Sequence, residues 1–392
     1  MSNAQRTLRV GFVIDRWQPS RGGAERALAQ LARHLEQRGH TALAFADEGP
    51  KPGEDAPGQV HLVARKGWSL SRGGRERAFA EAALRAAEAQ DCDVTLGVRH
   101  LPRVDVYWPH GGSHARSLAA LRAARAWTEA QPSVVTPVTP AGRHRAFVQF
   151  ERELMEGGGA RRVVCVSKLV ERELAADFPG GRERLVHIGN GVDLETFHAH
   201  DRLRSGLAVR RELRMEERGA LIAFVARQPV LKGLPVLFAA LSRLRDEDWN
   251  LVVAGPRDVA QWRRRARAAG LAEERVRIVA HADSAELLGA ADILAHPTWR
   301  DTSGLVVLEA LASGTPVITT ACAGEAESVT TECGTVLERP GDVAGLSEAL
   351  RLWILRSQQR SVDHDAIRAS VAERGQEAWL QRITHELLEA AR

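Results

Sequence analysis

Short apolar runs rich in β-branched residues alternate with long helical patterns along the whole chain. This alternation is typical of parallel sheets whose strands are joined by crossover helices. We expect strands in the first half at 9–14, 42–46, 60–63, 94–98, 104–108 and 163–166, with helices such as 24–37 and 75–89 between them. The second half restarts the pattern, with strands expected at 221–225, 249–254, 276–279, 293–296, 317–320 and 334–337. The sequence thus predicts an α/β protein with two doubly wound, Rossmann-like parallel sheets.

The length of the chain also favours two domains. At 392 residues it exceeds what one hydrophobic core ordinarily holds. A turn at Asn190-Gly191-Val192-Asp193 is followed by a charged stretch at 198–219, and we place the domain break there. The predicted domains are therefore 1–198 and 199–373, followed by an amphipathic helix within 374–392.

The composition limits the cellular setting and the partners. The sequence has no run of the roughly 18–20 apolar residues that a membrane span needs. The apolar stretch 10–14 is too short for a signal peptide, so we expect a cytoplasmic protein. The net charge of +4 is carried by the first half, without any recognisable nucleic-acid-binding module. We therefore expect no nucleic-acid partner.

Neither the cysteines nor the acidic pairs indicate a metal site. The four cysteines are scattered without CxxC pairs, at Cys92, Cys165, Cys322 and Cys333. Two Asp-x-Asp triplets, at 91–93 and 363–365, suit capping and surface acids. We expect neither a bound metal nor another cofactor.

The segment RDTSGLVVLEALASGTPVITT, at 300–320, carries the strongest functional signal. Asp301 and Glu309 flank a small-residue turn that opens an apolar helix. Backbone N–H groups at a helix N-terminus attract anions, phosphates above all. Glu309, about one turn further on, can accept hydrogen bonds from vicinal sugar hydroxyls. The segment therefore predicts a nucleotide-sugar site that includes Ser303 and the amides of Gly304, Leu305 and Val306.

The alternative for this segment is an ordinary capped helix, with Asp301 or Ser303 as the N-cap. That alternative explains Ser303 and the Leu/Val run but not Glu309 on an otherwise apolar helix.

Two cations follow the first expected strand of the second half. In VARQPVLKGLPVL, at 225–237, Arg227 and Lys232 stand five residues apart. Two cations on a short loop can neutralise a diphosphate leaving group without a metal. The alternative is a solvated arginine and a turn lysine.

Two weaker signals lie in the first half. Gly22-Gly23 follows the first strand and opens a helix, where backbone can approach a ligand closely. An ordinary tight turn explains the glycines equally well. His110, in DVYWPHGGSH, ends a strand where α/β sheets place ligands. Without further information, a structural or exposed histidine is the more frequent case.

These segments, taken together, resemble the family 4 retaining glycosyltransferases, which have the GT-B fold. The 300–320 segment resembles the family's acidic–seven–acidic motif, and the Arg227…Lys232-Gly pattern resembles its diphosphate clamp. The resemblance implies that Glu309 holds the ribose and that Asp301, where relatives usually have Glu, binds donor-sugar hydroxyls. It also implies that His110 contacts the transferred sugar, that Gly22-Gly23 lines the cleft, and that helix 374–392 crosses back to the acceptor-side N-terminal domain. His110, Arg227, Lys232 and Asp301 are therefore the expected catalytic residues.

Within the family the chain is most similar to lipopolysaccharide core glucosyltransferases, on segments such as GVRHLPRVDVYWPHGG and HPTWRDTSGLVVLEA. The resemblance implies metal-independent, retaining transfer of a hexosyl group, with glucose expected, from a UDP-sugar to a lipid-linked sugar acceptor. Lipopolysaccharide core or another cell-envelope glycan would be the acceptor, at the inner membrane. Two alternatives stay open: a nucleotide-sugar-binding protein without transfer activity, and a nucleotide-sugar epimerase.

The amphipathic stretch 114–130 has two interpretations. It is either a surface helix packed on its own domain or a basic, Trp-bearing face that touches anionic membrane.

Overall fold

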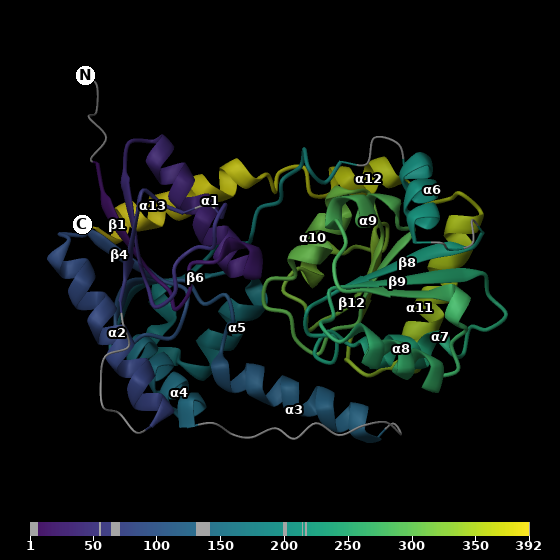
Figure 1. Ribbon diagram of the computed structural model, residues 1–392, viewed down its shortest axis with the longest axis horizontal. Coiled ribbons are helices and arrows are strands. Elements are labelled where there is room, and N and C mark those ends of the chain that lie inside the picture. The colour runs from purple at the N-terminus through teal and green to yellow at the C-terminus, as the bar shows by residue number, and fades with distance from the viewer. Residues whose placement is uncertain are drawn as a thin grey trace. The chain divides into compact units, whose positions relative to one another are not determined.

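The computed structural model describes residues 7–391 except 55, 64–70, 131–141, 199–201, 214, 216 and 217. The chain divides into two compact units. The first unit comprises Met1–Ser117, Pro137–Asn190 and Glu377–Arg392, and the second comprises Leu118–Thr136 and Gly191–Gln376. Each unit contains one parallel sheet with helices packed on it (Figure 1).

The first unit contains a seven-stranded parallel sheet in the order β3-β2-β1-β4-β5-β6-β7. Its strands are β1 (Arg9–Val13), β2 (Thr41–Ala46), β3 (Gln59–Leu62), β4 (Val94–Gly97), β5 (Val104–Tyr107), β6 (Ala160–Cys165) and β7 (Leu185–His187). Its helices are α1 (Gly23–Gln37), α2 (Arg72–Ala89), α4 (Gly142–Met155), α5 (Lys168–Asp177) and α13 (Gln376–Ala390), with short turns η1 (Pro19–Arg21) and η2 (Pro179–Arg184). The expected strands are present, and β7 is an additional strand that the sequence pattern did not indicate.

The second unit contains a six-stranded parallel sheet in the order β10-β9-β8-β11-β12-β13. Its strands are β8 (Ala220–Val225), β9 (Trp249–Ala254), β10 (Val276–Val279), β11 (Ile293–His296), β12 (Val317–Thr320) and β13 (Gly334–Leu337). Its helices are α6 (Arg202–Glu212), α7 (Leu234–Leu241), α8 (Val259–Ala268), α9 (Ser284–Ala290), α10 (Leu305–Ala312), α11 (Val343–Gln358) and α12 (His364–Ala369), with turns η3 (Glu273–Arg275) and η4 (Ala326–Ser328).

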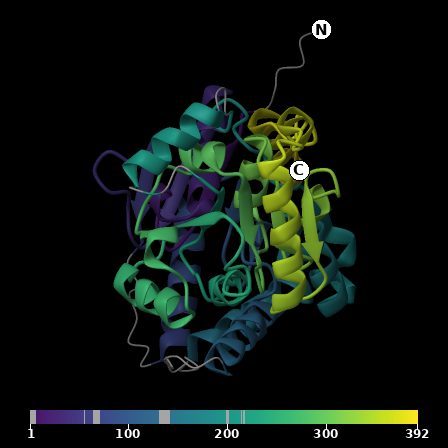
Figure 2. The ribbon, with the colours of Figure 1, turned by 90° about the vertical axis from the view of Figure 1, so that its right-hand side faces the viewer.

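Alternate residues of β8 serve two separate cores. Ile222 and Phe224 pack into one buried cluster with Trp353 of α11, whereas Leu221 and Ala223 pack into another with Leu308 of α10. Since successive side chains of a strand point to opposite faces, this alternation places helices on both faces of the sheet. Figure 2 shows the α11 helix lying along the strands of this unit. The sheet is therefore doubly wound, as predicted.

The last helix belongs to the first unit. Trp379, Leu380, Ile383 and Leu387 of α13 are buried in the core of the first sheet. The Arg38 guanidinium at the end of α1 pairs with the Glu377 carboxylate of α13 at 2.5 Å, and the two helices lie side by side in Figure 1. The C-terminal helix thus completes the N-terminal core.

Two boundaries differ from the expected ones. The charged stretch at 198–219, where we expected the domain break, contains α6, and the division falls at Asn190/Gly191 instead. Helix α3 (His114–Ala130) begins in the first unit, but its residues from Leu118 on group with the second. The Trp127 ring of α3 lies 6.4 Å from the Trp299 ring, centroid to centroid. This aromatic packing explains why the later part of the helix groups with the second unit.

Among the described residues, no helix is both long enough and apolar enough to cross a bilayer.

Candidate functional site

The loop after β8 is folded so that Lys232 faces the loop after β11. The Lys232 N–H donates to the Gln228 carbonyl at 3.0 Å, which closes a turn. Gly233 follows with φ of +84°, and a Cβ at this position would collide with the Pro297 carbonyl. Only glycine allows this close approach of the two loops. The Lys-Gly pair in the sequence therefore has a direct steric reason.

Two further hydrogen bonds join these loops. The Trp299 N–H donates to the Leu231 carbonyl at 2.9 Å, and the Thr298 hydroxyl donates to the same carbonyl at 3.2 Å. Strands β8 and β11 are neighbours whose connections run to opposite sides of the sheet. Doubly wound sheets bind ligands at the carboxyl ends of strands at such a switch point. The joined loops thus lie where the fold predicts a ligand.

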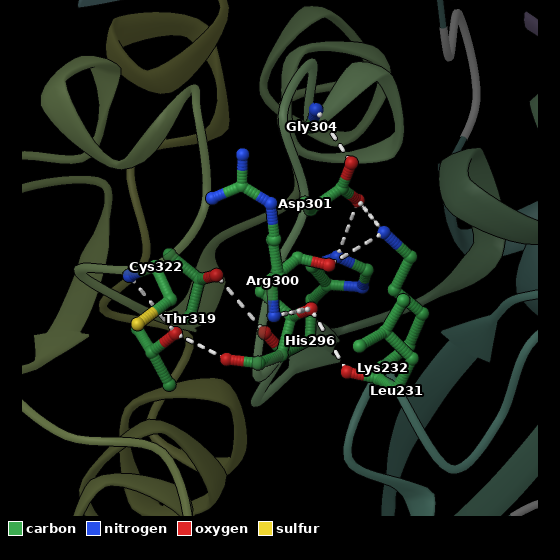
Figure 3. Close-up of polar contacts among 10 residues, drawn as sticks. Leu231, Lys232, His296, Arg300, Asp301, Gly304, Thr319 and Cys322 are labelled. Carbon is green, nitrogen blue, oxygen red and sulfur yellow. Dashed lines mark hydrogen bonds and ion pairs between the residues drawn. The ribbon is translucent and has the colours of Figure 1, made fainter. Parts of the chain in front are cut away.

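Three groups contact the Asp301 carboxylate: the Lys232 ammonium, the His296 ring and the Gly304 N–H (Figure 3). The Lys232 ammonium lies 2.9 Å from Asp301 Oδ2, and His296 Nε2 lies 2.8 Å from the same oxygen. The Lys232 ammonium also donates to the Arg300 carbonyl at 3.1 Å. The two side chains of the ion pair are only 19% and 16% exposed, respectively, so water screens their attraction weakly. The centre is a shielded ion pair with fixed geometry.

The pKa values define the charges in this centre. Burial alone would raise the pKa of Asp301, but the Lys232 charge and the hydrogen bond from His296 lower it well below its ordinary value. Burial lowers the pKa of His296, although Asp301 opposes that shift. These shifts favour an ionised Asp301 beside a neutral His296, which then donates to the carboxylate from Nε2.

The turn after Asp301 differs in one respect from the prediction. The Gly304 N–H, which we expected to be available for phosphate, donates to Asp301 Oδ1 at 3.0 Å. An aspartate three residues before an amide commonly accepts its hydrogen bond. Gly304 itself has φ of +65°, and in the described structure no side chain caps the α10 helix that follows it. The Leu305 and Val306 amides are therefore the remaining backbone candidates for an anion.

The other predicted residues of the second unit lie nearby in the chain. Arg227 is exposed directly after β8, whereas Ser303 and Glu309 are half-buried at the start of α10 and within it. The structure brings Lys232, Asp301 and the Gly304 turn into direct contact. The roles of Arg227, Ser303 and Glu309 stay predictions.

The predicted residues of the first unit occupy the ends of its strands. Gly22 is extended and precedes the first turn of α1, which begins at Gly23. The centroids of the His110 and Trp108 rings lie 4.3 Å apart, and the backbone N–H of His110 donates to the Trp108 carbonyl. Burial lowers the pKa of His110 to about 3, so the ring is neutral at ordinary pH. A neutral imidazole can exchange hydrogen bonds with a sugar without adding charge.

Two groups of charged or titratable residues escaped the sequence analysis. At the switch point of the first sheet, Arg99 Nε lies 2.7 Å from Asp15 Oδ1, and each residue follows a strand closely. His296 is the last residue of an expected strand, and its position at the carboxyl end of that strand could have indicated a functional residue.

In the described part of the chain, no three His, Cys, Asp or Glu side chains are grouped as metal ligands.

Comparison with known proteins gives matches over both halves of the chain. Residues 21–196 match the family model described as Glycosyltransferase Family 4, and residues 219–355 match the model described as Glycosyl transferases group 1. The chain is 24% identical to lipopolysaccharide glucosyltransferase WaaG of Escherichia coli, over 90% of this chain and 91% of that protein.

Solved structures show the same fold. The crystal structure of WaaG superposes with a TM-score of 0.78 at 22% identity, covering 96% of this chain and 99% of that one. The structure of Anabaena HepE in complex with UDP-glucose superposes with a TM-score of 0.73 at 18% identity, covering 97% and 100%. Both similarities extend over the two sheets.

Proposed function

We propose that this chain, which belongs to the GT-B glycosyltransferases of family 4 and is related to the lipopolysaccharide glucosyltransferase WaaG, transfers a hexosyl group from a UDP-sugar to a cell-envelope glycan. The observation that carries the proposal is the Lys232–Asp301 pair beside the Gly304 turn, at the switch point of the second sheet. A cation and helix amides at this position suit the diphosphate of a nucleotide sugar.

The donor would bind the second unit through its charged part. Lys232, held at Asp301 before binding, would share its ammonium with the diphosphate, and Arg227 would supply a second cation. The Leu305 and Val306 amides would receive a phosphate oxygen at the start of α10. Glu309 would accept hydrogen bonds from the ribose, as the family resemblance implies.

The same groups would act in the reaction. As the anomeric bond breaks, negative charge develops on the leaving diphosphate, so fixed cations and amides stabilise the transition state more than the ground state. We propose retaining transfer, with the acceptor attacking on the face that the diphosphate leaves. The leaving phosphate would take the acceptor's proton. No metal ion is required in this scheme, because Lys232 and Arg227 supply the positive charge.

Roles toward the sugar are proposed from the family resemblance. His110 and Ser303 would contact its hydroxyls, and Gly22-Gly23 would leave space for a ligand. Asp301 is a structural part of the lysine site, because Lys232, His296 and Gly304 all contact its carboxylate. The same carboxylate would bind the donor sugar. Glucose is the proposed sugar, because WaaG is named a glucosyltransferase and the HepE structure contains UDP-glucose.

The acceptor would be a lipid-linked glycan at the inner membrane, and we propose peripheral membrane contact through α3. The structure favours a packed helix over an aromatic membrane anchor, since Trp127 lies against Trp299. Arg116 is bound bidentately by Asp177, at 2.8 and 2.6 Å, so the exposed Arg122 is the main charge for anionic lipid. Co-sedimentation with phosphatidylglycerol vesicles should weaken in Arg122→Gln; equal binding contradicts this contact.

The transfer activity is tested by UDP release. UDP-glucose, UDP-galactose and GDP-mannose are supplied with and without truncated core oligosaccharide, and free nucleoside diphosphate and glycosylated product are measured. The proposal expects acceptor-dependent UDP release and a product of retained anomeric configuration. Nucleotide-sugar binding without release supports the non-catalytic alternative, and conversion of the donor sugar without acceptor supports an epimerase.

A further inference from the structure

The loop after β12 is joined to the turn that precedes α10. The Asp301 N–H donates to the Cys322 carbonyl at 3.0 Å, and the Gly324 N–H donates to the Asp301 carbonyl at 2.6 Å. A Cβ at Gly304 would lie 3.1 Å from the Glu325 nitrogen and 3.2 Å from the Glu325 Cβ. The backbone of Glu325 is thus in contact with the turn that precedes the amides proposed to bind diphosphate, and it limits where that turn can lie.

The Glu325 side chain forms an ion pair in which the carboxylate is buried and the Arg374 side chain is 29% exposed. Its carboxylate is 2% exposed and accepts from Arg374 Nη2 at 2.8 Å and from the Ser328 hydroxyl at 2.9 Å. Burial raises the pKa of Glu325, and the Arg374 guanidinium opposes that rise. Removing one partner of a buried, hydrogen-bonded pair leaves the other without compensation. Glu325 and its loop therefore depend on Arg374.

Arg374 lies where the chain passes between the two units. Its carbonyl accepts from the Val192 N–H at 2.8 Å, and the Val192 carbonyl accepts from the Gln376 N–H at 3.1 Å. Val192 and Gly375 form a parallel bridge. Two of the divisions between the units, at Asn190/Gly191 and at Gln376/Glu377, fall within a few residues of this bridge. These two crossings are therefore held together at Arg374.

A continuous series of contacts follows from these observations. It runs from the two crossing segments through the Arg374 side chain to Glu325, and from Glu325 to the Gly304 turn. We infer that Arg374 and Glu325 form a positioning pair that couples the 301–304 turn to the two crossing segments at 190/191 and 376/377. This inference rests on the proposed function for the identity of the ligand. The pair acts through the turn and need not touch the donor.

The coupling gives the enzyme a way to respond to its donor. A ligand can shift a conformational equilibrium only through contacts that differ between the states. A diphosphate bound beside the 301–304 turn favours one position of Glu325, and the ion pair transmits that preference to Arg374. Because Arg374 holds the crossing segments at 190/191 and 376/377, donor occupancy changes the backbone protection of these segments. Without the Glu325–Arg374 ion pair, donor binding no longer affects the crossing segments.

The first test needs no ligand. Hydrogen exchange is measured by mass spectrometry on peptides covering 190–196 and 299–306 in the wild type, Glu325→Gln, Arg374→Met and Arg368→Met. Arg368 is the matched control, because it donates to the Leu194 carbonyl at 3.3 Å, beside the first crossing, instead of to Glu325. The coupling predicts about tenfold faster exchange in both peptides for Arg374→Met, and a change confined to 190–196 for Arg368→Met. An unchanged 299–306 peptide in a folded Arg374→Met overturns the inference.

The second test uses UDP and turnover. UDP affinity is measured by calorimetry, the UDP-dependent hydrogen exchange of the 190–196 peptide by mass spectrometry, and kcat and KM by UDP release. We expect Glu325→Gln and Arg374→Met to bind UDP with little change, but to lose the UDP-dependent protection of 190–196 and most of kcat. Retention of wild-type protection and kcat in both variants overturns the coupling. If the wild type binds neither UDP nor any activated sugar, the proposed function is wrong. The hydrogen-exchange experiment still tests the coupling in that case.

A double substitution completes the test. If Glu325 and Arg374 act as one unit, Glu325→Gln/Arg374→Met should exchange at 299–306 no faster than the worse single variant. Additive effects of the two substitutions contradict a shared pathway. The Arg374→Lys variant keeps the charge and should restore part of the protection, which a merely steric role of the side chain would not predict.

Discussion

The Lys232 ammonium and Asp301 Oδ2 lie 2.9 Å apart, although their loops follow different strands, β8 and β11. Glycine at position 233 allows the loops to meet, His296 contacts the same carboxylate oxygen as Lys232, and the Gly304 N–H donates to the other oxygen. The lysine is therefore positioned before any donor binds. Preorganised charge of this kind costs little reorganisation during the reaction.

Removal of the lysine should abolish most turnover. We expect Lys232→Ala to lower kcat/KM for the donor by about 100-fold or more, because a preorganised cation on the leaving group is lost. Thermal unfolding should still be cooperative. Lys51→Ala, at an exposed turn of the first unit, is the control and should keep full activity. Near-normal turnover in Lys232→Ala excludes the assigned role.

Replacement of Asp301 should reduce both stability and activity. Asp301→Asn leaves the Lys232 ammonium beside a neutral amide, and we expect a loss of about 2 kcal/mol in the free energy of unfolding. Asp301→Glu restores the acid usual in the family, but its extra methylene cannot keep all three contacts of 2.8 to 3.0 Å. Chemical denaturation and UDP release measure both effects. Higher activity in Asp301→Glu than in the wild type counts against a site matched to aspartate.

The sequence predicted the sheets and named Lys232 and Asp301, which the structure places in contact, because these predictions rest on local patterns. Short apolar, β-branched runs indicate the strands, and Lys232-Gly233 and the 301–309 segment carry their chemistry within a few residues. Strand β7 was missed because only three residues, Leu185–His187, form it. His296 was missed because it looks like part of an apolar strand.

Other features depend on distant contacts. The Glu325–Arg374 pair joins residues 49 positions apart, and no local pattern announces it. The Gly304 amide was expected to be available, but the side chain of Asp301 satisfies it, a choice that the sequence left open between a cap and a sugar-binding acid. Helix α3 has an amphipathic pattern that shows which face is buried but not against which unit.

Stability should fall in acid partly because of His110. Its pKa is lowered from 6.5 to about 3 in the folded state, so below 6.5 the unfolded chain binds a proton that the folded chain does not. The stability is complete above the unfolded pKa and decreases as pH falls toward the folded pKa, by about 1.4 kcal/mol per pH unit for one such group. Urea denaturation from about pH 7 to 5 should show a shallower pH dependence in His110→Gln than in the wild type. Equal slopes would contradict burial of a neutral ring.

The ribose contact predicts a defect in donor affinity. We expect Glu309→Gln to raise KM for the UDP-sugar by about tenfold with a smaller change in kcat, because a charged acceptor of two hydroxyls becomes a neutral one. Glu348→Gln, on the exposed side of α11, is the matched control. An unchanged KM in Glu309→Gln removes the residue from the donor site.

The central claim is that cations and amides of the second unit bind the diphosphate without a divalent ion. Calorimetric titration of UDP into the wild type and Lys232→Ala, both in excess EDTA, tests it most directly. We predict saturable binding by the wild type and at least about a tenfold loss of affinity in Lys232→Ala. Binding that requires added manganese, or equal affinity in the two proteins, would contradict the account.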